Sequence, residues 1–271
     1  MAPRRHPPYG GSVDPADVDR YLSRLGLPSV PEPSRACLAE LQYAHLVAVP
    51  FENLDIVFAG GVPHDGAAAL DKVLGGRGGW CFELNEPFGA LLRALGYDVV
   101  RLGAAVLLGG PSRVLDHLTL EVSGGSDLIA PHLVDVGFGD SFTVPLALNR
   151  SGPQPGGPAE FELVPSPEGT TLAEYVDGIP EARFRFKRVA HDFAAFAPIA
   201  ASMQTDPEKH WHRKPFATRL LGAGSDRVTL THDAITFRRD GLVERHDVAR
   251  VDWDHLLDEW FSMERPGPWP E

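Results

Sequence analysis

The chain is organised around the stretch Arg-Gly-Gly-Trp-Cys-Phe-Glu-Leu-Asn at residues 77–85. Its two glycines lack a Cβ, so the backbone there can turn tightly and approach other groups closely. The apolar residues that follow Cys81 recur with the spacing of one helix face: Leu84, Phe88, Leu91, Leu92 and Leu95. Gly96 ends this segment. We therefore place Cys81 at a loop-to-helix junction, where free N–H groups and the helix dipole favour a thiolate.

Cysteine is rare in this chain. Only two cysteines occur in 271 residues, so they do not form a framework of disulfides. Cys81 on its own has two interpretations, a reactive thiolate or a buried, inert side chain in a helix cap. Cys37 shares a helix face with Leu41 and Ala44, and we expect it to pack there as a small hydrophobic residue.

The composition is that of a globular protein, with 43% hydrophobic and 23% charged residues. The formal net charge of −12 argues against general binding to nucleic acid or to anionic membranes. No apolar run reaches the ~18 residues of a membrane span, and residues 1–11 lack the apolar core of a secretory signal. These features predict a cytoplasmic protein with a short disordered lead-in.

Helical signals dominate the N-terminal third. Asp14 can cap a first helix and Ser34 a second one. A third, short helix is expected over about residues 65–74. Glu52 and Asn53 are polar residues inside an apolar run, so they must be hydrogen-bonded if they are buried.

After Gly96 the hydrophobic pattern changes from a helical period to the alternation of strands. Strands are expected at residues 97–108, 117–122 and 128–136. The first of them should break near Gly103. In the second, His117 shares a face with Thr119 and Glu121.

The C-terminal part should add further strands and two short helices. The strands are expected at residues 161–164, 172–176, 184–189, 227–232 and 235–248, and the helices at 192–201 and 253–261. Asp240-Gly241 predicts a hairpin turn within the last strand segment. The proline-rich tail after residue 261 is expected to be loose.

A cysteine nucleophile requires a base that takes its proton and a group that orients that base. The chain has 11 histidines, so the base must be chosen by context. His117 begins a strand beside a glycine-rich turn, and Asp135 is a carboxylate within an apolar strand end. An unpaired charge there is costly, so Asp135 requires a histidine or an arginine as its partner. An arginine partner would make Asp135 purely structural.

Other polar residues are weaker candidates for chemistry. His132 lies an odd number of positions from Asp135, so the two side chains would point to opposite faces of an extended strand. His210 and His212 could share a face, but no cysteine or carboxylate cluster accompanies them, and no metal is expected. The basic residues that either meet phosphates or form a solvated surface are Arg183, Arg185, Lys187, Arg188, Arg213 and Lys214.

Several blocks of the sequence resemble the arylamine N-acetyltransferase family. Four specific blocks occur in order, at residues 49–54 (VPFENL), 77–85, 117–120 (HLTL) and 134–139 (VDVGFG), and a looser fifth block spans 203–211. The resemblance covers about residues 14–262 and is weakest over residues 148–186. It favours the interpretation of Cys81 as a reactive thiolate.

The resemblance implies an α+β fold of three domains. Residues 1–96 would form a helical domain that carries the nucleophile. Residues 97–190 would form a β-barrel-like domain that carries the histidine and the aspartate, and residues 191–271 an α/β domain that acts as a lid.

The resemblance also implies a papain-like catalytic triad, with Cys81 as nucleophile, His117 as base and Asp135 as the orienting residue. Phe51 and Phe138 match the aromatic residues that bind the acceptor substrate. Acetyl-CoA would be the acyl donor and a substrate, with no permanently bound cofactor, and no CoA-contacting residues are assigned. The acceptor partner would be an arylamine, an arylhydroxylamine or a hydrazine.

One departure from the family pattern concerns the catalytic helix. Pro87 falls within the first turns of that helix, so the helix either begins near Glu86 or is kinked. Two other functions also stay open. The first is a macrolactam-forming amide synthase that uses the same triad with a polyketide thioester, and the second is a cysteine hydrolase.

Overall fold

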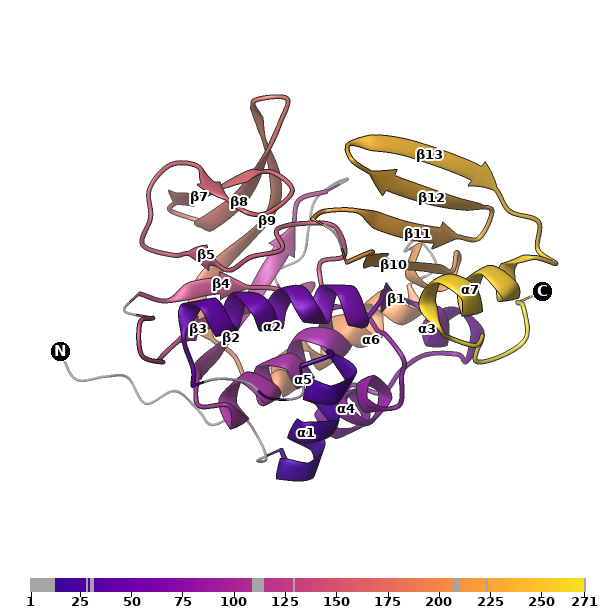
Figure 1. The fold of residues 1–271 in the computed structure, drawn as a ribbon, viewed down its shortest axis with the longest axis horizontal. Helices are drawn as coiled ribbons and strands as arrows, with labels where there is room; N and C mark the ends of the chain where they lie inside the picture. The colour runs from indigo at the N-terminus through magenta and orange to yellow at the C-terminus, as the bar shows by residue number, and fades with distance from the viewer. Residues whose placement is uncertain are drawn as a thin grey trace.

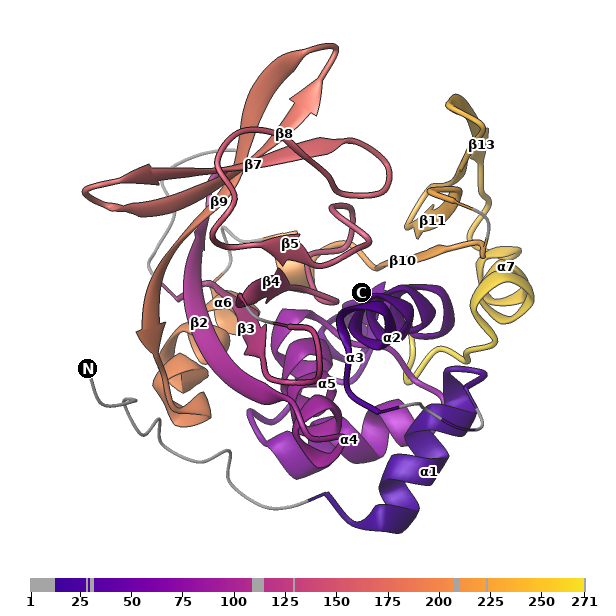
Figure 2. The same ribbon diagram turned by 60° about the vertical axis from the view of Figure 1, so that its left-hand side comes forward.

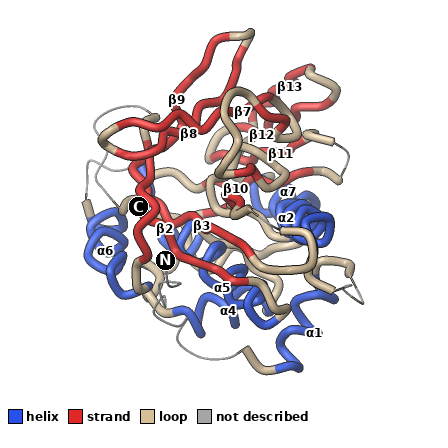
Figure 3. The backbone as a smooth tube through the Cα atoms, turned by 90° about the vertical axis from the view of Figure 1, so that its left-hand side faces the viewer, coloured by secondary structure: helices blue, strands red, loops and turns tan. Residues whose placement is uncertain are grey.

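The computed structural model describes residues 13–27, 29, 32–108, 115–128, 130–206, 210–222 and 224–270. The expected lead-in at residues 1–11 and residues 207–209 of the fifth block lie outside this part of the chain. A layer of helices packs against one of two antiparallel sheets, and the second sheet stands beside it (Figure 1). Most helices gather at one end of the molecule and most strands at the other (Figure 3). The expected α+β class is confirmed.

The first helices begin at the capping residues that the sequence predicts. Asp14 accepts a hydrogen bond from the Ala16 N–H, and Ser34 accepts one from the Cys37 N–H. The α-helices of the described residues are α1 (Pro15–Arg24), α2 (Arg35–Ala48), α3 (Leu54–Phe58), α4 (Gly66–Leu74), α5 (Cys81–Ala94), α6 (Ala197–Thr205) and α7 (Trp253–Phe261). Short 3₁₀ helices are η1 (Phe193–Phe196) and η2 (His210–His212).

The larger sheet is eight-stranded and antiparallel, in the order β5-β4-β3-β2-β9-β8-β7-β6. Its strands are β2 (Asp98–Val106), β3 (His117–Ser123), β4 (His132–Val134), β5 (Leu146–Ala147), β6 (Gln154–Pro155), β7 (Glu160–Ser166), β8 (Gly169–Val176) and β9 (Ile179–Ala190). The sheet curves strongly around its own apolar core (Figure 2). The expected barrel-like character is therefore confirmed.

The smaller sheet joins the helical part of the chain to the C-terminal part. It has the order β1-β10-β11-β12-β13. Its strands are β1 (Phe51–Glu52), β10 (Phe216–Leu220), β11 (Arg227–Thr231), β12 (Ala234–Arg239) and β13 (Leu242–Asp247). Beside β1, the buried Asn53 donates to the carbonyls of Trp211 (2.7 Å) and Lys214 (3.0 Å) and accepts from the Phe216 N–H (2.9 Å). The division of the chain into domains at residues 96 and 190 stays a prediction.

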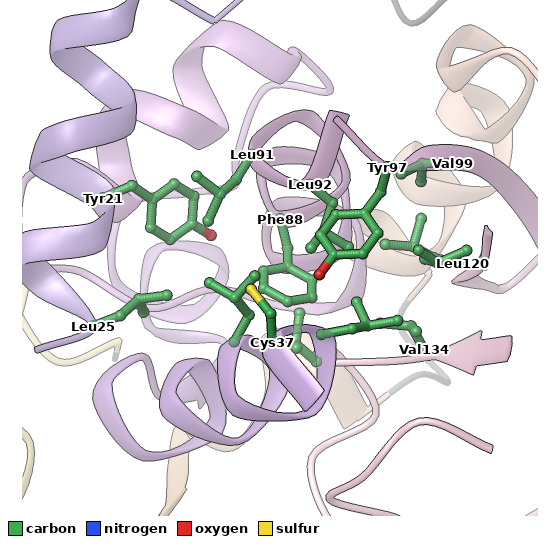
Figure 4. Close-up of a cluster of buried hydrophobic side chains, with 14 of the residues drawn as sticks. Tyr21, Leu25, Cys37, Phe88, Leu91, Leu92, Tyr97, Val99, Leu120 and Val134 are labelled. Carbon is green, nitrogen blue, oxygen red and sulfur yellow. The ribbon is translucent and has the colours of Figure 1, made fainter. Parts of the chain in front are cut away.

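The largest apolar cluster lies between the helices and the concave sheet. Cys37 points from α2 into this cluster and lies beside Phe88 and Tyr97 (Figure 4). Val99 and Leu120 reach the same cluster from β2 and β3. Cys37 thus packs as the small hydrophobic residue that the sequence predicts, and α5 is held against the sheet by a continuous apolar contact.

The strand expected over residues 128–136 is shorter than predicted, since β4 covers only residues 132–134. The chain before β4 is bound elsewhere. The Asp127 carboxylate accepts a hydrogen bond from the Arg35 N–H (2.6 Å) at the start of α2. Pro131, directly before β4, has no N–H to donate to a neighbouring strand, so alternation alone overestimated the strand.

The break expected near Gly103 is also wrong, because β2 runs through this residue. The irregularity is instead a register shift in the pairing with β9, between Leu102 and Ala104. A Cβ on Gly103 would overlap the side chain of Leu115. The glycine therefore allows a close side-chain contact and does not end the strand.

The C-terminal tail is packed, contrary to the expectation that it is loose. Met263 is buried. The Trp269 ring meets the rings of Phe58 and Trp253 edge-on, with centroids 5.1 and 5.3 Å away. Aromatic residues in the tail thus outweigh its prolines and fix it to α3 and α7.

Candidate active site

The loop before Cys81 packs tightly against β1. The Gly79 N–H donates to the Pro50 carbonyl (3.2 Å), and the Gly79 carbonyl accepts from the Glu52 N–H (2.9 Å). A Cβ on Gly78 would overlap the same Pro50 oxygen. Neither glycine has a positive φ. Both are therefore required for close backbone approach rather than for an unusual backbone conformation.

Helix α5 begins at Cys81, as the sequence predicts. Trp80 is the N-cap residue, and the Glu83 carboxylate accepts from its N–H (3.4 Å). Pro87 lies inside the helix without ending it, so the alternative start near Glu86 is wrong. The proline leaves the Glu83 carbonyl without its helical donor, but the helix is held by its burial on both sides.

His117 contacts both other residues of the expected triad. Its Nε2 lies 2.6 Å from Asp135 Oδ2, and its ring is hydrogen-bonded to the Cys81 side chain. The residues are 3% (Cys81), 2% (His117) and 3% (Asp135) exposed. The structure therefore brings the three residues together in a site that bulk water does not reach.

The charges of His117 and Asp135 stabilise each other. Burial alone would lower the pKa of His117, but the Asp135 carboxylate and the hydrogen bonds to Asp135 and Cys81 raise this pKa well above its usual value. Burial would raise the pKa of Asp135, but His117 and hydrogen bonds from Asn85 and Gly137 hold it below its usual value. Both shifts describe an imidazolium next to a carboxylate.

Asn85 holds Asp135 in place from the next turn of α5. Its Nδ2 donates to Asp135 Oδ1 (2.9 Å) and to the Leu118 carbonyl (2.7 Å). Its Oδ1 accepts from the Val136 N–H (3.0 Å). No role for Asn85 was predicted from the sequence. The available signal was its position four residues after Cys81, which places both on one helix face.

Gly137 lets the aspartate loop approach the helix start. Its N–H donates to Asp135 Oδ1 (2.9 Å). A Cβ at this position would lie 2.7 Å from Cys81 Cα and 2.7 Å from Asn85 Nδ2. Any side chain here would push Asp135 and Cys81 apart.

The two phenylalanines expected to bind substrate are half-buried near the site. The Phe138 ring meets the His117 ring edge-on at 5.2 Å, and the Phe51 ring meets Trp211 edge-on at 6.0 Å. A Cβ on Gly139 would lie 2.8 Å from the Phe51 ring. Phe51 therefore lies against the residue that follows Phe138.

His132 contacts the backbone rather than the residues of the expected triad. Its Nδ1 lies 2.9 Å from the Ala130 carbonyl oxygen. Burial lowers the pKa of His132, which favours its neutral form. The two histidines of this region thus have opposite electrostatic surroundings.

A second cluster of charges, two of them buried and the others half-buried, lies beside the first turn of α5. Lys72 Nζ lies 2.6 Å from Asp55, 3.0 Å from Glu83 and 3.4 Å from Glu52. Arg77 lies 3.1 Å from Asp55. Burial raises the pKa of Glu83 to about 7, against the opposing attraction of Lys72. The polar Glu52 noted in the sequence is thus paired, as a buried carboxylate requires.

Two of the basic residues considered for phosphate binding are paired with acids. Arg183 lies 2.7 Å from Glu174, and Arg188 makes two hydrogen bonds of 2.7 Å to Glu121.

Within the described ranges, no group of three or more His, Cys, Asp or Glu residues could hold a metal ion. The side chain of His210 is outside the described part. No helix of that part is long and apolar enough to span a bilayer.

Sequence comparisons place the chain among acetyltransferases. Residues 36–266 match a family model described as N-acetyltransferase. An arylamine N-acetyltransferase / N-hydroxyarylamine O-acetyltransferase of Salmonella typhimurium is 35% identical over 259 residues, which cover 90% of this chain and 87% of that protein. A pineal gland arylamine N-acetyltransferase of Gallus gallus is 35% identical over 59% of this chain and 56% of its own length. A proansamycin X synthase of Amycolatopsis mediterranei is 33% identical over 58% of this chain and 61% of its own length.

Solved structures agree with these relatives. The arylamine N-acetyltransferase of Salmonella typhimurium superposes with a TM-score of 0.84 at 27% identity, over 92% of this chain and 91% of that one. The Mycobacterium marinum enzyme in complex with CoA gives a TM-score of 0.81 at 27% identity, over 90% and 92%. The fold and the sequence together define the protein as an acyltransferase of the N-acetyltransferase type. The chain belongs to the arylamine N-acetyltransferase family.

Proposed function

We propose that this protein transfers an acetyl group from acetyl-CoA to the nitrogen of an arylamine, an arylhydroxylamine or a hydrazine, through an acetylated Cys81. One observation carries the proposal: His117 lies 2.6 Å from Asp135 and is hydrogen-bonded to Cys81 at the start of α5. Membership of the family and the similarity to an enzyme solved with CoA support the choice of donor.

In the first half-reaction Cys81 attacks the thioester. His117 holds the thiol proton as an imidazolium that Asp135 stabilises, and Cys81 Sγ forms a bond to the acetyl carbonyl carbon. The N–H groups in the first turn of α5 have no helical acceptor and can stabilise the oxyanion that develops. The bond between that carbon and the CoA sulfur then breaks, and the CoA thiolate takes the proton from His117.

In the second half-reaction the acceptor nitrogen attacks the acetyl group. His117 takes a proton from the nitrogen, and Cys81 leaves as a thiolate, which restores the ion pair. The nitrogen must keep a free lone pair, and arylamines do so at neutral pH because they are largely unprotonated. Phe138 lies beside His117, and Phe51 lies next to Gly139, so the two rings could enclose an aromatic acceptor.

The test is the intact mass of the protein after mixing with acetyl-CoA in the absence of an acceptor. We expect one acetyl group, which peptide mapping assigns to Cys81. The matched control is Cys37→Ala, which should still be acetylated, whereas Cys81→Ala should not. Aniline or hydrazine should then remove the group and appear as the acetylated product. Acetyl on Cys37, or no acetyl at all, would overturn the proposal.

A second candidate is the formation of a macrolactam amide, with a polyketide thioester as donor and its own arylamine as acceptor. The similarity to a proansamycin X synthase favours it. Both candidates use the same triad, so the acceptor step separates them. If acetyl-Cys81 forms but no simple arylamine or hydrazine removes it, while a long acyl thioester that carries an aniline group is cyclised, the second candidate replaces the first.

A further inference from the structure

The loop at residues 135–140 connects the triad to the smaller sheet. It begins at Asp135, which is paired with His117. It then passes Phe138, whose ring meets His117, and Gly139, which lies against Phe51. The loop ends at Asp140, whose side chain binds residues of the smaller sheet. One short loop thus carries Phe138 and contacts both His117 and Phe51.

Asp140 binds two arginines of the smaller sheet. Its carboxylate forms a two-pronged pair with Arg238 of β12, at 2.7 and 2.8 Å. Arg227 of β11 lies 3.2 Å from the same carboxylate. Arg227 also donates to Thr218 on β10 (3.2 Å). A single carboxylate is therefore tied, directly or through Arg227, to three strands of that sheet.

The two arginines differ in how much they depend on Asp140. The side chain of Arg238 is 35% exposed and that of Asp140 is 51% exposed, so water screens this pair. The side chain of Arg227 is only 6% exposed. A buried guanidinium that loses its carboxylate is left without compensation for its lost hydration. Removal of Asp140 should therefore disturb the contact between the sheets more than removal of Arg238.

We propose that Asp140 is a positioning residue for the acceptor: through Arg238 and Arg227 it fixes the loop that carries Phe138 and so sets the spacing between the rings of Phe138 and Phe51. This inference rests on the proposed function for the identity of the acceptor. Asp140 touches neither the thiol nor the imidazole, so its loss acts on the acceptor step through the two rings. The attack of Cys81 on the donor depends mainly on His117 and Asp135.

The variants are Asp140→Ala, Arg238→Ala and the conservative Asp140→Glu. The matched control is Asp254→Ala. Asp254 makes a comparable two-pronged pair with Arg265, at 2.8 and 2.9 Å, and is equally exposed at 51%, but it lies on α7. If Asp140→Ala does not fold, Arg238→Ala gives the same test, because it leaves the buried arginine with its carboxylate.

The first readout is kinetic. Asp140→Ala should raise KM for an aniline about two- to threefold, part of the effect of a lost ring contact, while the rate of Cys81 acetylation by acetyl-CoA changes much less. Arg238→Ala should give a smaller change in the same direction, and Asp140→Glu should recover part of the wild-type KM. Equal changes in both half-reactions, or an equal KM change in Asp254→Ala, would overturn the inference.

The second readout does not require the proposed reaction. It is the ratio of the rates at which N-phenylmaleimide and N-ethylmaleimide alkylate Cys81. Two well-spaced rings favour the phenyl reagent, so this ratio should fall about two- to threefold in Asp140→Ala and stay unchanged in Asp254→Ala. An unchanged ratio in Asp140→Ala overturns the inference. If acetyl-CoA fails to acetylate the wild type but the ratio still depends on Asp140, the proposed function is wrong and the positioning role stands.

Discussion

Two buried ion pairs lie where α5 meets the larger sheet, and by distance they are alike. His117 and Asp135 are 2.6 Å apart, and Arg101 and Glu86 are also 2.6 Å apart. All four residues are buried. The first pair adjoins the thiol of Cys81, whereas the second joins α5 to β2 through two parallel hydrogen bonds.

The difference lies in the cation. An imidazole exchanges its proton near neutral pH, whereas a guanidinium stays charged at any pH that a protein survives. Burial and short distance are therefore common to a pair that can move a proton and to one that can only hold two elements together. The His117 pair is the candidate for catalysis because its cationic side chain titrates and lies beside a nucleophile.

The largest effect is expected from Asp135→Asn. This variant removes the charge that stabilises the imidazolium and can favour the wrong tautomer of His117, which should lower kcat/KM on the order of 10³- to 10⁴-fold. Single-turnover acetylation of Cys81 measures the loss, and circular dichroism shows whether the variant is folded.

The same variant has a pH signature. The raised pKa of His117 and the lowered pKa of Asp135 keep both charges in place as the pH falls from neutral, so alkylation of Cys81 in the wild type should persist in acid. In folded Asp135→Asn it should be lost at a higher pH. His132→Ala is the control and should match the wild type. If His132→Ala loses the reactivity and Asp135→Asn keeps it, the orienting residue has been assigned wrongly.

The next effect belongs to the structural pair. Arg101→Met leaves Glu86 buried without a partner and should cost about 3–5 kcal/mol in the free energy of unfolding. Under conditions where the variant stays folded, its specific activity should stay near that of the wild type. Urea unfolding and acetylation kinetics check the two halves of this statement. The double variant Arg101→Met/Glu86→Leu should recover much of the stability. A large loss of activity at unchanged stability would erase the distinction between the two pairs.

A smaller effect should separate two buried carboxylates near the start of α5. The pKa of Asp135 is lowered, but that of Glu83 is raised from 4.5 to about 7. The folded state therefore holds a proton on Glu83 that the unfolded state releases, so this group makes the free energy of unfolding fall as the pH rises from about 4.5 to 7.

Glu83→Gln removes this contribution because an amide does not titrate. Urea unfolding at several pH values within that range should show a smaller loss of stability with rising pH in Glu83→Gln than in the wild type. Asp254→Asn is a control at an exposed carboxylate. Parallel curves for Glu83→Gln and the wild type would show that Glu83 is ionised throughout, like Asp135.

The smallest effect is expected at the rings. Phe51→Ala or Phe138→Ala should raise KM for anilines by about fivefold, equivalent to about 1 kcal/mol of lost ring contact. Acetylation of Cys81 should change less. Steady-state kinetics with varied acceptor, compared with single-turnover acetylation, makes the distinction. Equal effects on the two half-reactions would mean that the rings support His117 rather than the acceptor.

Local signals in the sequence located most elements. Asp14 and Ser34 mark helix starts, and Asp240-Gly241 marks the turn between β12 and β13, because caps and tight turns are determined by adjacent residues. Strand ends were less predictable. The strand expected over residues 128–136 begins only at His132, because Pro131 has no N–H to donate to a neighbouring strand.

The same limit applies to the site. The stretch around Cys81 and the polar residue in an apolar strand end indicated a nucleophile and Asp135. Context made His117 a candidate among 11 histidines, but only the family resemblance gave it the role of base. The role of Asn85 was missed because its partners come from β3 and from the loop after β4. Asp140 carried no local signal at all, since its partners lie on another sheet.

The pairing of β1 with β10 has a consequence for synthesis on the ribosome. All residues of the proposed triad have been made once the chain reaches Asp135, but the rings that meet Phe51 belong to Trp211 and to Phe216 at the start of β10. A nascent chain that has not reached β10 therefore contains the three residues of the proposed triad without the rings that meet Phe51. Acetyl transferred to Cys81 at that stage would be open to water, so an unfinished chain is expected to hydrolyse the donor rather than pass its acetyl group to an amine.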